Sequence, residues 1–315
     1  MWLLLKYTLL YASVLMLVAL GGMFSERSGV INIALEGIMV VGGLIGVVMI
    51  NIMNAAGVPI ALALLITIGT SALAGAVYSS LLAFSAINLK ADQTIGGTAL
   101  NLLAAALAVV VAKRVNGTDS SKISYSSSVN QHLNNVNYTF NIGPLTVNWF
   151  IVVSVAALAI AWFILYKTRF GMRLMSCGEH PQAADSVGIN VYKMRWAGVL
   201  MSGALGGIGG MAYIVPAVGD WNFETGVAGM GFLALAVMIF GQWKPLNIAG
   251  ASLFFAVFRA MANIFDSIPA LKALGWPKEI YNMMPFIASM VVLAFTSKKS
   301  RAPKAEGIPY DQGKR

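Results

Sequence analysis

Three polar segments interrupt an otherwise apolar sequence, and they hold the residues whose types and spacing could do chemistry. The first covers residues 24–37 and reads FSERSGVINIALEG. Irregular backbone at membrane depth is tolerated only where protein or a water-filled cavity surrounds it, and interrupted helices often line a transport path. The segment therefore indicates either part of a path for a polar solute or an ordinary short loop in which Glu26 and Arg27 form a solvated charge pair.

The second polar segment, residues 170–190, reads FGMRLMSCGEHPQAADSVGIN. Pro181 suits the first turn of a helix, Glu179 would lie near the positive end of that helix, and Gly188 suits its C-terminal stop. The pattern predicts a short helix over about 180–188 between two longer ones. A short helix lying across a membrane face is a natural docking site for a soluble partner, and a plain interhelical connection is the alternative.

The third polar segment, residues 219–226, reads GDWNFETG and mixes aromatic rings with hydrogen-bonding groups. Such a mixture suits a gate, or a contact for a polar solute that carries a ring. Aromatic residues also gather at membrane–water interfaces, so an interface anchor is an equal alternative.

The sequence lacks the motifs of ATP binding and of catalysis. It has no GxxxxGK[ST] phosphate loop and no GxSxG nucleophile elbow. The two histidines, His132 and His180, lie far apart, and no Cys/His cluster has the spacing of metal ligands. The apolar runs lack the paired charges of a proton or sodium relay, with Arg259 as the main deep cation. We expect no catalytic residue, metal site or cofactor in this chain, and a pore whose energy comes from elsewhere.

The composition places these segments in a membrane protein. Hydrophobic residues make up 58% of the chain and charged residues 10%, whereas a soluble domain carries about 25% charged residues. A span needs roughly 20 mostly apolar residues to cross about 30 Å of hydrocarbon. We predict an all-α bundle of eight to ten transmembrane helices over residues 1–296. The nine apolar segments cover about 2–23, 34–53, 60–86, 97–112, 148–166, 197–217, 229–241, 247–264 and 281–296.

Glycine and charge patterns add packing and orientation. The glycines at 42–43 and 206–210 predict close contact between helices, because small residues let helix backbones approach. Basic residues crowd the connection at 167–196 and the tail at 297–315, which puts both in the cytoplasm. Residues 115–147 then fall outside, and the side of the N-terminus stays open. The net charge of +9 does not imply nucleic acid, because the basic residues lie beside apolar spans.

At these residues the chain resembles the inner-membrane permeases of ABC importers in the branched-chain amino acid, simple sugar and nucleoside group. Residues 28–37, SGVINIALEG, look like the "SGxxNIxLEG" element of the nucleoside branch, and the GGIDLS-like stretch of ribose-type permeases is absent. Residues 170–190 look like the group's "FGxxxRxxGxxxxAAxxxGI" loop, which carries the coupling helix that docks on the ATPase. Arg173 stands one or two positions early in that pattern. The resemblance covers nearly the whole chain and implies a type II-like permease architecture.

The resemblance also implies partners and a mechanism. We expect a cytoplasmic ATP-binding cassette ATPase that holds ATP and Mg²⁺, a second, paralogous permease subunit, an extracytoplasmic substrate-binding lipoprotein, and a bacterial cell membrane. The solutes would be nucleosides, carried by alternating access. Interhelical hydrogen bonding is the alternative for each polar residue chosen here. The expected solute-path residues are Phe24, Asn32, Glu36, Gln93, Asn101, Trp221 and Asn222, and the expected ATPase-coupling residues are Gly178, Glu179, His180, Pro181, Ala183, Ala184 and Gly188.

Other transport functions remain open at this point. The same machinery could import a simple sugar such as ribose or galactose, or a branched-chain amino acid. An ion-coupled secondary transporter is a further alternative, and it would need a buried acidic residue whose neutralisation abolishes uptake.

Overall fold

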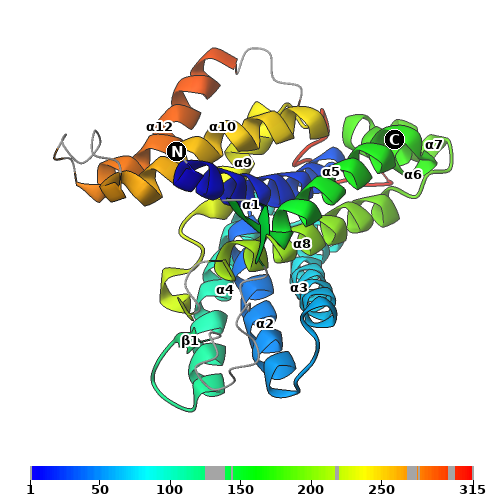
Figure 1. Ribbon diagram of the computed structural model, residues 1–315. Coiled ribbons are helices and arrows are strands. Elements are labelled where there is room, and N and C mark those ends of the chain that lie inside the picture. The colour runs from blue at the N-terminus through cyan, green and yellow to red at the C-terminus, as the bar shows by residue number, and fades with distance from the viewer. Residues whose placement is uncertain are drawn as a thin grey trace.

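The computed structural model describes residues 2–124, 139–142, 145–216, 220–267, 275, 277–296 and 302–313, and they form a bundle of helices (Figure 1). The long helices are α1 Trp2–Arg27, α2 Leu35–Ala55, α3 Ile60–Ala83, α4 Gln93–Asn116, α5 Trp149–Lys167, α8 Val191–Ile214, α10 Pro245–Ile264 and α12 Lys278–Thr296. The shorter helical elements are η1 Phe84–Asn88, α6 Arg169–Glu179, α7 Pro181–Ser186, η2 Phe223–Thr225, α9 Met230–Phe240 and η3 Phe265–Ser267. Four short strands are β1 Lys122–Ser124, β2 Thr139–Ile142, β3 Leu145–Asn148 and β4 Asp220–Asn222.

Eight helices in the described part of the chain are long and apolar enough to cross a membrane, which agrees with the predicted range. The ninth predicted segment forms α12, a helix of 19 residues that contains Pro285. The segment predicted at 229–241 is too short to span a membrane as one helix. Its helix α9 has 11 residues and spans only about 16 Å, so it reaches spanning length only together with η2.

Helix α8 lies at the centre and packs along α1, α2 and α3. Glycines permit this. A Cβ on Gly42 of α2 would overlap Gly207 of α8, which confirms the contact predicted for these two glycine segments. A Cβ on Gly203 of α8 would lie 2.5 Å from the carbonyl oxygen of Gly75 on α3, a contact that was not predicted. We call Gly42, Gly75, Gly203 and Gly207 the glycine seam. Small residues are the usual means by which membrane helices come into backbone contact.

The outer helices keep one buried stripe and expose the rest of their surface. Only 22% of the apolar stretch of α4 and of α5 is buried, against 67% for α1 and α8. The buried residues of α4 recur every three or four positions and face α2; they are Gln93, Gly97, Leu100, Ala104, Ala108 and Ala112. The exposed apolar faces suit lipid or another membrane protein.

Two ends of the bundle can be told apart. At one end lie the α1–α2 turn, α6 and α7, and the C-terminal residues lie beside α6 and α7 (Figure 1). The two segments predicted to be cytoplasmic, 167–196 and the described part of the tail, are therefore at the same end. At the other end β1 pairs antiparallel with β4, with Lys122 opposite Asn222. The predicted outer loop at 115–147 thus carries a little structure, including the hairpin of β2 and β3.

Candidate functional site

The polar break between α1 and α2 is held by amide side chains from α4. Asn101 accepts a hydrogen bond from the backbone N–H of Gly37 at 2.8 Å and donates to the carbonyl oxygen of Ile33 at 2.9 Å. Gln93 Oε1 accepts from the backbone N–H of Ile31 at 2.7 Å. These amides satisfy backbone groups that the break leaves without helical partners. The structure therefore brings Gln93 and Asn101 to the segment that the sequence singled out separately.

Asn32 and Phe24 lie on the inner side of the same break. Asn32 is fully buried and its Nδ2 donates to Ser202 Oγ on α8 at 2.8 Å. Within the described residues, Asn32 Oδ1 and Gln93 Nε2 are buried without a hydrogen-bond partner. Phe24 faces a cavity of about 360 Å³ that it shares with apolar residues of α5 and α8. Whether these residues contact a solute stays a prediction.

Glu26 at the end of α1 is buried and Arg27 is half-buried, so the alternative of a solvated Glu26–Arg27 pair is wrong. Glu26 is 4% exposed and accepts from Trp243 Nε1 at 2.5 Å. Arg27 donates to the carbonyl oxygen of Trp243 at 3.1 Å, and its Nη1 lies 3.9 Å from Glu179 Oε1. The end of α1 is thus packed against the α9–α10 turn and the end of α6.

Glu36, at the start of α2, caps the interrupted helix α9. Its Oε1 accepts from the backbone N–H of Gly229 at 2.8 Å and its Oε2 from that of Gly231 at 2.7 Å. The first N–H groups of a helix have no partners inside the helix and carry partial positive charge. The carboxylate therefore fixes where the half-helix α9 begins, in the interior of the bundle.

Trp221 and Asn222 close the loop that leads into η2 and α9. Trp221 Nε1 donates to the carbonyl oxygen of Gly226 at 3.0 Å. Asn222 Oδ1 accepts from Ser121 Oγ at 2.8 Å and from the backbone N–H of Glu224 at 3.1 Å. These bonds join the loop after α4 to the loop after α8.

An aromatic–arginine cluster lies between α1, α8, α10 and α12. Arg259 donates to Asn282 Oδ1 at 3.4 Å and to Tyr213 Oη at 3.3 Å, and its guanidinium carbon lies 5.9 Å from the centre of the Tyr11 ring. The Tyr213 ring centre lies 6.3 Å from that of Tyr11 and 5.4 Å from that of Trp221. Arg259 is half-buried, and among the described residues its Nε has no hydrogen-bond partner.

Sequence reasoning found only part of this cluster. It singled out Arg259 as the deep cation and Trp221 as a possible solute contact, but it gave no role to Tyr11, Tyr213 or Asn282. These three residues come from three helices that are distant in the sequence. The only signal was their polarity within apolar runs, which is where functional residues of membrane proteins concentrate.

The short helix predicted over about 180–188 is present. Helix α7 runs from Pro181 to Ser186 with proline in its first turn, and Gly188 follows with φ of +83°. That left-handed conformation favours glycine and ends a helix. Gly178 and Glu179 are the last two residues of α6, the helix that precedes α7. The sequence analysis did not predict α6 as a separate helix.

Helix α7 has one buried and one exposed face. Pro181 and Ala184 are buried against the protein, whereas His180, Ala183 and Gly188 are exposed. Gly178 is buried against α1, where an added Cβ would overlap the carbonyl group of Arg27. The candidate coupling residues therefore divide into an outward set, which a partner could contact, and an inward set, which attaches α7 to the bundle.

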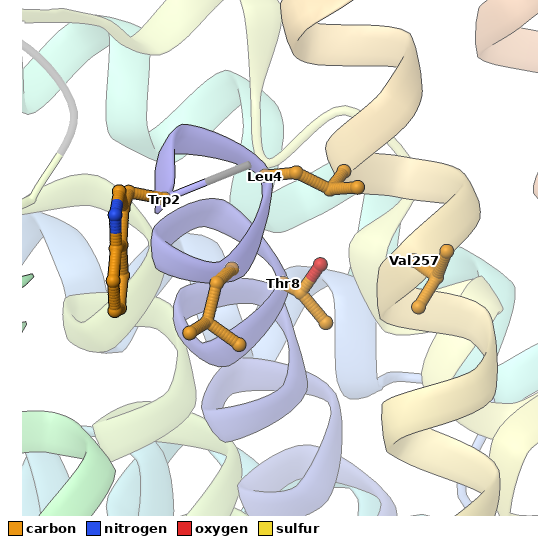
Figure 2. Close-up of a pocket in the computed structure, with 5 residues that line it drawn as sticks. Trp2, Leu4, Thr8 and Val257 are labelled. Atoms are coloured by element: carbon orange, nitrogen blue, oxygen red, sulfur yellow. The ribbon is translucent and has the colours of Figure 1, made fainter.

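The cavity between the start of α1 and α10 does not suit a polar solute. It has a volume of about 520 Å³ and is lined by Trp2, Leu4, Leu5, Thr8 and Val257 (Figure 2). Ligand sites usually combine an apolar lining with a few convergent polar groups, and here Thr8 Oγ1 is the main one. Within the described residues, no group of three His, Cys, Asp or Glu side chains could hold a metal ion.

The family that matches this chain and three of its relatives are described as transport permeases. Residues 4–294 match the family described as branched-chain amino acid transport system / permease component. The nucleoside ABC transporter permease protein NupC of Lactococcus lactis is 40% identical over 97% of this chain and 96% of its own length. The guanosine ABC transporter permease protein NupQ of Bacillus subtilis is 40% identical over 98% of this chain and 96% of its own. The Lactococcus lactis nucleoside permease protein NupB is 27% identical over 57% of this chain and 47% of its own. No solved structure matches the chain.

Proposed function

Since the chain belongs to the branched-chain amino acid transport system permease family, we propose that it is the membrane-spanning permease subunit of an ABC importer for nucleosides. Identity of 40% over nearly the full length to a nucleoside and a guanosine permease supports this substrate class. The eight apolar helices supply the membrane domain.

The aromatic–arginine cluster is the observation that favours nucleosides over the alternative cargoes. Arg259 lies 14 residues after Pro245, where α10 leaves the cytoplasmic end, so it lies about 21 Å into the bundle. A nucleobase offers a flat face for stacking on Tyr11, Tyr213 or Trp221 and acceptor atoms for a guanidinium. A branched-chain amino acid has no such face.

Membrane orientation follows from the ends of α1. Arg27 lies beside Glu179 at the end that carries the basic connection, which we place in the cytoplasm of a bacterial cell. The 26 residues of α1 extend about 39 Å, so the N-terminus lies on the outer side and the C-terminus on the cytoplasmic side.

The partners and the mechanism are those of an ATP-driven importer. The exposed face of α7 would dock on a cytoplasmic ATPase, which binds ATP and Mg²⁺, and a lipoprotein would deliver the solute at the outer end. Both NupC and NupB of Lactococcus lactis are similar to this chain, which supports a pair of different permease subunits. Movement of α7 would switch the path that Phe24, Asn32, Glu36, Gln93, Asn101, Trp221 and Asn222 line.

Uptake in cells with and without the gene tests the substrate class. We expect deletion to abolish uptake of radiolabelled uridine and guanosine, to leave ribose uptake unchanged, and to be mimicked by disabling the partner ATPase. Loss of ribose uptake alone would move the cargo to sugars. Uptake that persists without the ATPase but collapses with the ion gradient would indicate a secondary transporter.

A paired substitution tests the cluster. Arg259→Gln should lower nucleoside uptake at least tenfold while membrane insertion is unchanged, because a neutral amide cannot replace the guanidinium. Asn263→Ala, an exposed polar position on the same helix, is the matched control and should transport normally. Equal uptake by both variants would remove the cluster from the solute path.

A further inference from the structure

The described part of the C-terminal tail, residues 302–313, folds back onto the cytoplasmic end of the bundle, and we call it the C-terminal strap. The sequence predicted only a basic tail there. The backbone N–H of Ala305 donates to the carbonyl oxygen of Gly178 on α6 at 2.8 Å, and that of Gly307 donates to Gly29 in the α1–α2 turn at 3.3 Å. The strap therefore bonds to α6 and to the polar break at once.

Arg195, near the start of α8, donates a hydrogen bond to the strap. Arg195 is 1% exposed, and its Nη1 donates to the carbonyl oxygen of Ile308 at 2.9 Å. A buried guanidinium is costly unless it is hydrogen-bonded. Among the described residues, Arg195 Nε and Nη2 have no further hydrogen-bond partner, so the bond to the strap is a main means of satisfying this side chain.

Tyr310 joins the strap to α7. Its side chain is 4% exposed and lies in a cluster with Cys177 of α6, Ala184 of α7 and Val191 of α8. The Tyr310 ring also packs edge-on against Tyr192, with 5.3 Å between ring centres. Ala184 belongs to the buried face of α7, so this face of the helix shares one small apolar cluster with Tyr310.

An ion pair extends the strap to the turn between α3 and α4. Lys90 Nζ lies 3.1 Å from Asp311 Oδ1, with about 40% of each side chain exposed. Exposed ion pairs contribute little, typically about 0.2–1 kcal/mol. The packing of Tyr310 and the backbone hydrogen bonds must therefore hold the strap.

From this geometry we propose that the C-terminal strap is a part of the coupling apparatus, which transmits displacement of α7 to the α1–α2 turn. The inference rests on the proposed function, because an ATPase must move α7. Closely packed elements pass displacements on rather than absorb them. The strap shares the Tyr310 cluster with α7 and bonds to the polar break through Gly307. Tyr310 and Gly307 lie only three residues apart in the chain.

The strap also adds to the docking surface. Val187, just after α7, is 74% exposed and Ile308 of the strap is 56% exposed. Both lie outside the membrane-spanning helices, where exposed apolar side chains indicate a contact with another protein. The proposed ATPase would cover both, so the strap would take part in docking as well as in transmission.

The chain carries its own reporter for the docked strap. Cys177 is the single cysteine, it is fully buried in the cluster that contains Tyr310, and burial raises the pKa of its thiol to about 11. Thiolate, not thiol, is the reactive form. In the purified complex we expect a maleimide to modify wild-type Cys177 slowly, and Tyr310→Ala to raise that rate at least tenfold. Tyr310→Phe keeps the ring and should stay within twofold of wild type.

Coupling is read as solute imported per ATP hydrolysed, in vesicles that contain the complete transporter. Tyr310→Ala should lower this ratio at least fivefold while the assembled complex still hydrolyses ATP, because α7 then moves without the α1–α2 turn. Gln312→Ala, an exposed strap position, is the matched control. If Cys177 stays protected in Tyr310→Ala, the strap has not been displaced. The same two measurements are then made on a variant that ends at residue 301 and so lacks the strap.

An unchanged ratio in a variant whose Cys177 has become reactive would overturn the proposal. Loss of the complex itself would also count against it, because the strap would then serve assembly and not transmission. The ratio is measured with whichever solute the wild-type complex imports. A wild-type complex that imports sugar in place of nucleoside would refute the proposed substrate class and leave the test of the strap intact.

Discussion

Substitution of Gly203 by alanine tests whether the glycine seam sets the spacing of the central helices. The added Cβ would lie 2.5 Å from the carbonyl oxygen of Gly75 and 2.6 Å from Ser79 Cβ, both on α3. Ordinary contact begins near 3.4 Å, so the two helices are about 0.9 Å too close for the methyl group. Because the obstacle is partly backbone, a rotamer change cannot remove it, and α3 and α8 must move apart.

The expected cost follows from that displacement. A gap of about 0.5–1 Å forfeits a quarter to a half of a dispersion well of about 0.1–0.2 kcal/mol for each atom pair. Some 20 to 40 pairs along the seam would then lose roughly 0.5–4 kcal/mol in total. Ser79 Oγ also donates to the carbonyl oxygen of Val199 at 3.2 Å, and an interhelical bond in a membrane is worth about 0.6 kcal/mol. We expect a loss of about 1–3 kcal/mol, the range for overpacked cores.

Thermal unfolding of the protein in detergent measures this loss. The control variant is Gly69→Ala. Gly69 lies on α3, the helix that Gly203 packs against, but at a position where an added Cβ meets no atom within 4 Å. Alanine favours a helix over glycine by up to about 1 kcal/mol, so this control should hold or raise the Tm while Gly203→Ala lowers it by several degrees. A Gly203→Ala protein as stable as its Gly69→Ala counterpart would refute the inference that the seam is in backbone contact.

Three further predictions concern local contacts. Glu36→Gln should speed hydrogen exchange at the N–H of Gly229 by at least fivefold, since an amide has one acceptor oxygen and leaves one capped N–H unpaired; unchanged exchange would refute the cap. Burial raises the pKa of Glu306 above its ordinary value. The protonated Glu306 therefore stabilises the docked strap fully at pH values below the ordinary pKa. This stabilisation is lost as the pH rises through the raised pKa. Proteolysis of the strap should therefore increase as pH rises above the ordinary carboxyl pKa of about 4.3 and lose that dependence in Glu306→Gln. Asp92 caps α4 by accepting from two backbone N–H groups at 2.8 and 3.0 Å, so Asp92→Ala should cost about 1 kcal/mol, measured by unfolding, and no change would contradict the cap.

Three effects set the pKa of Glu306: burial, the neighbouring Glu26 and the charge of Arg27. Interaction with the Glu26 carboxyl at the end of α1 and the charge of Arg27 both lower this pKa, but by less than burial raises it. Burial is the largest cause, so the neutral acid is favoured while the strap is docked. A docking equilibrium that strengthened with rising pH would mean that the Arg27 charge outweighs burial.

Most of the membrane architecture could be predicted because hydropathy is a property of local sequence. Apolar runs of about 20 residues located the spans, and basic connections assigned two segments to one end of the bundle, where the structure places them. Pro181 and Gly188 located α7, because proline in a first turn and a left-handed glycine after a last turn act within a few residues. Even the interruption before α9 was marked by polar residues at 219–226.

The site depended on contacts that no local pattern encodes. Asn101 and Gln93 reach the 28–37 turn only because α4 lies against α2 with one stripe buried. The sequence left open whether Glu26 was solvated, and the structure shows it buried and bonded to Trp243, more than 200 positions away.

The sequence by itself therefore determined that this is a polytopic membrane protein, where its helices run and where its short helix over 181–186 lies. Only the tertiary structure decided that Arg259 meets tyrosines from two other helices, that Glu36 begins α9, and that the tail returns to support α7. The reason is physical. Helix formation and membrane insertion depend on neighbours within one or two turns, whereas a polar cluster depends on how each helix is rotated and on which distant segment packs against it.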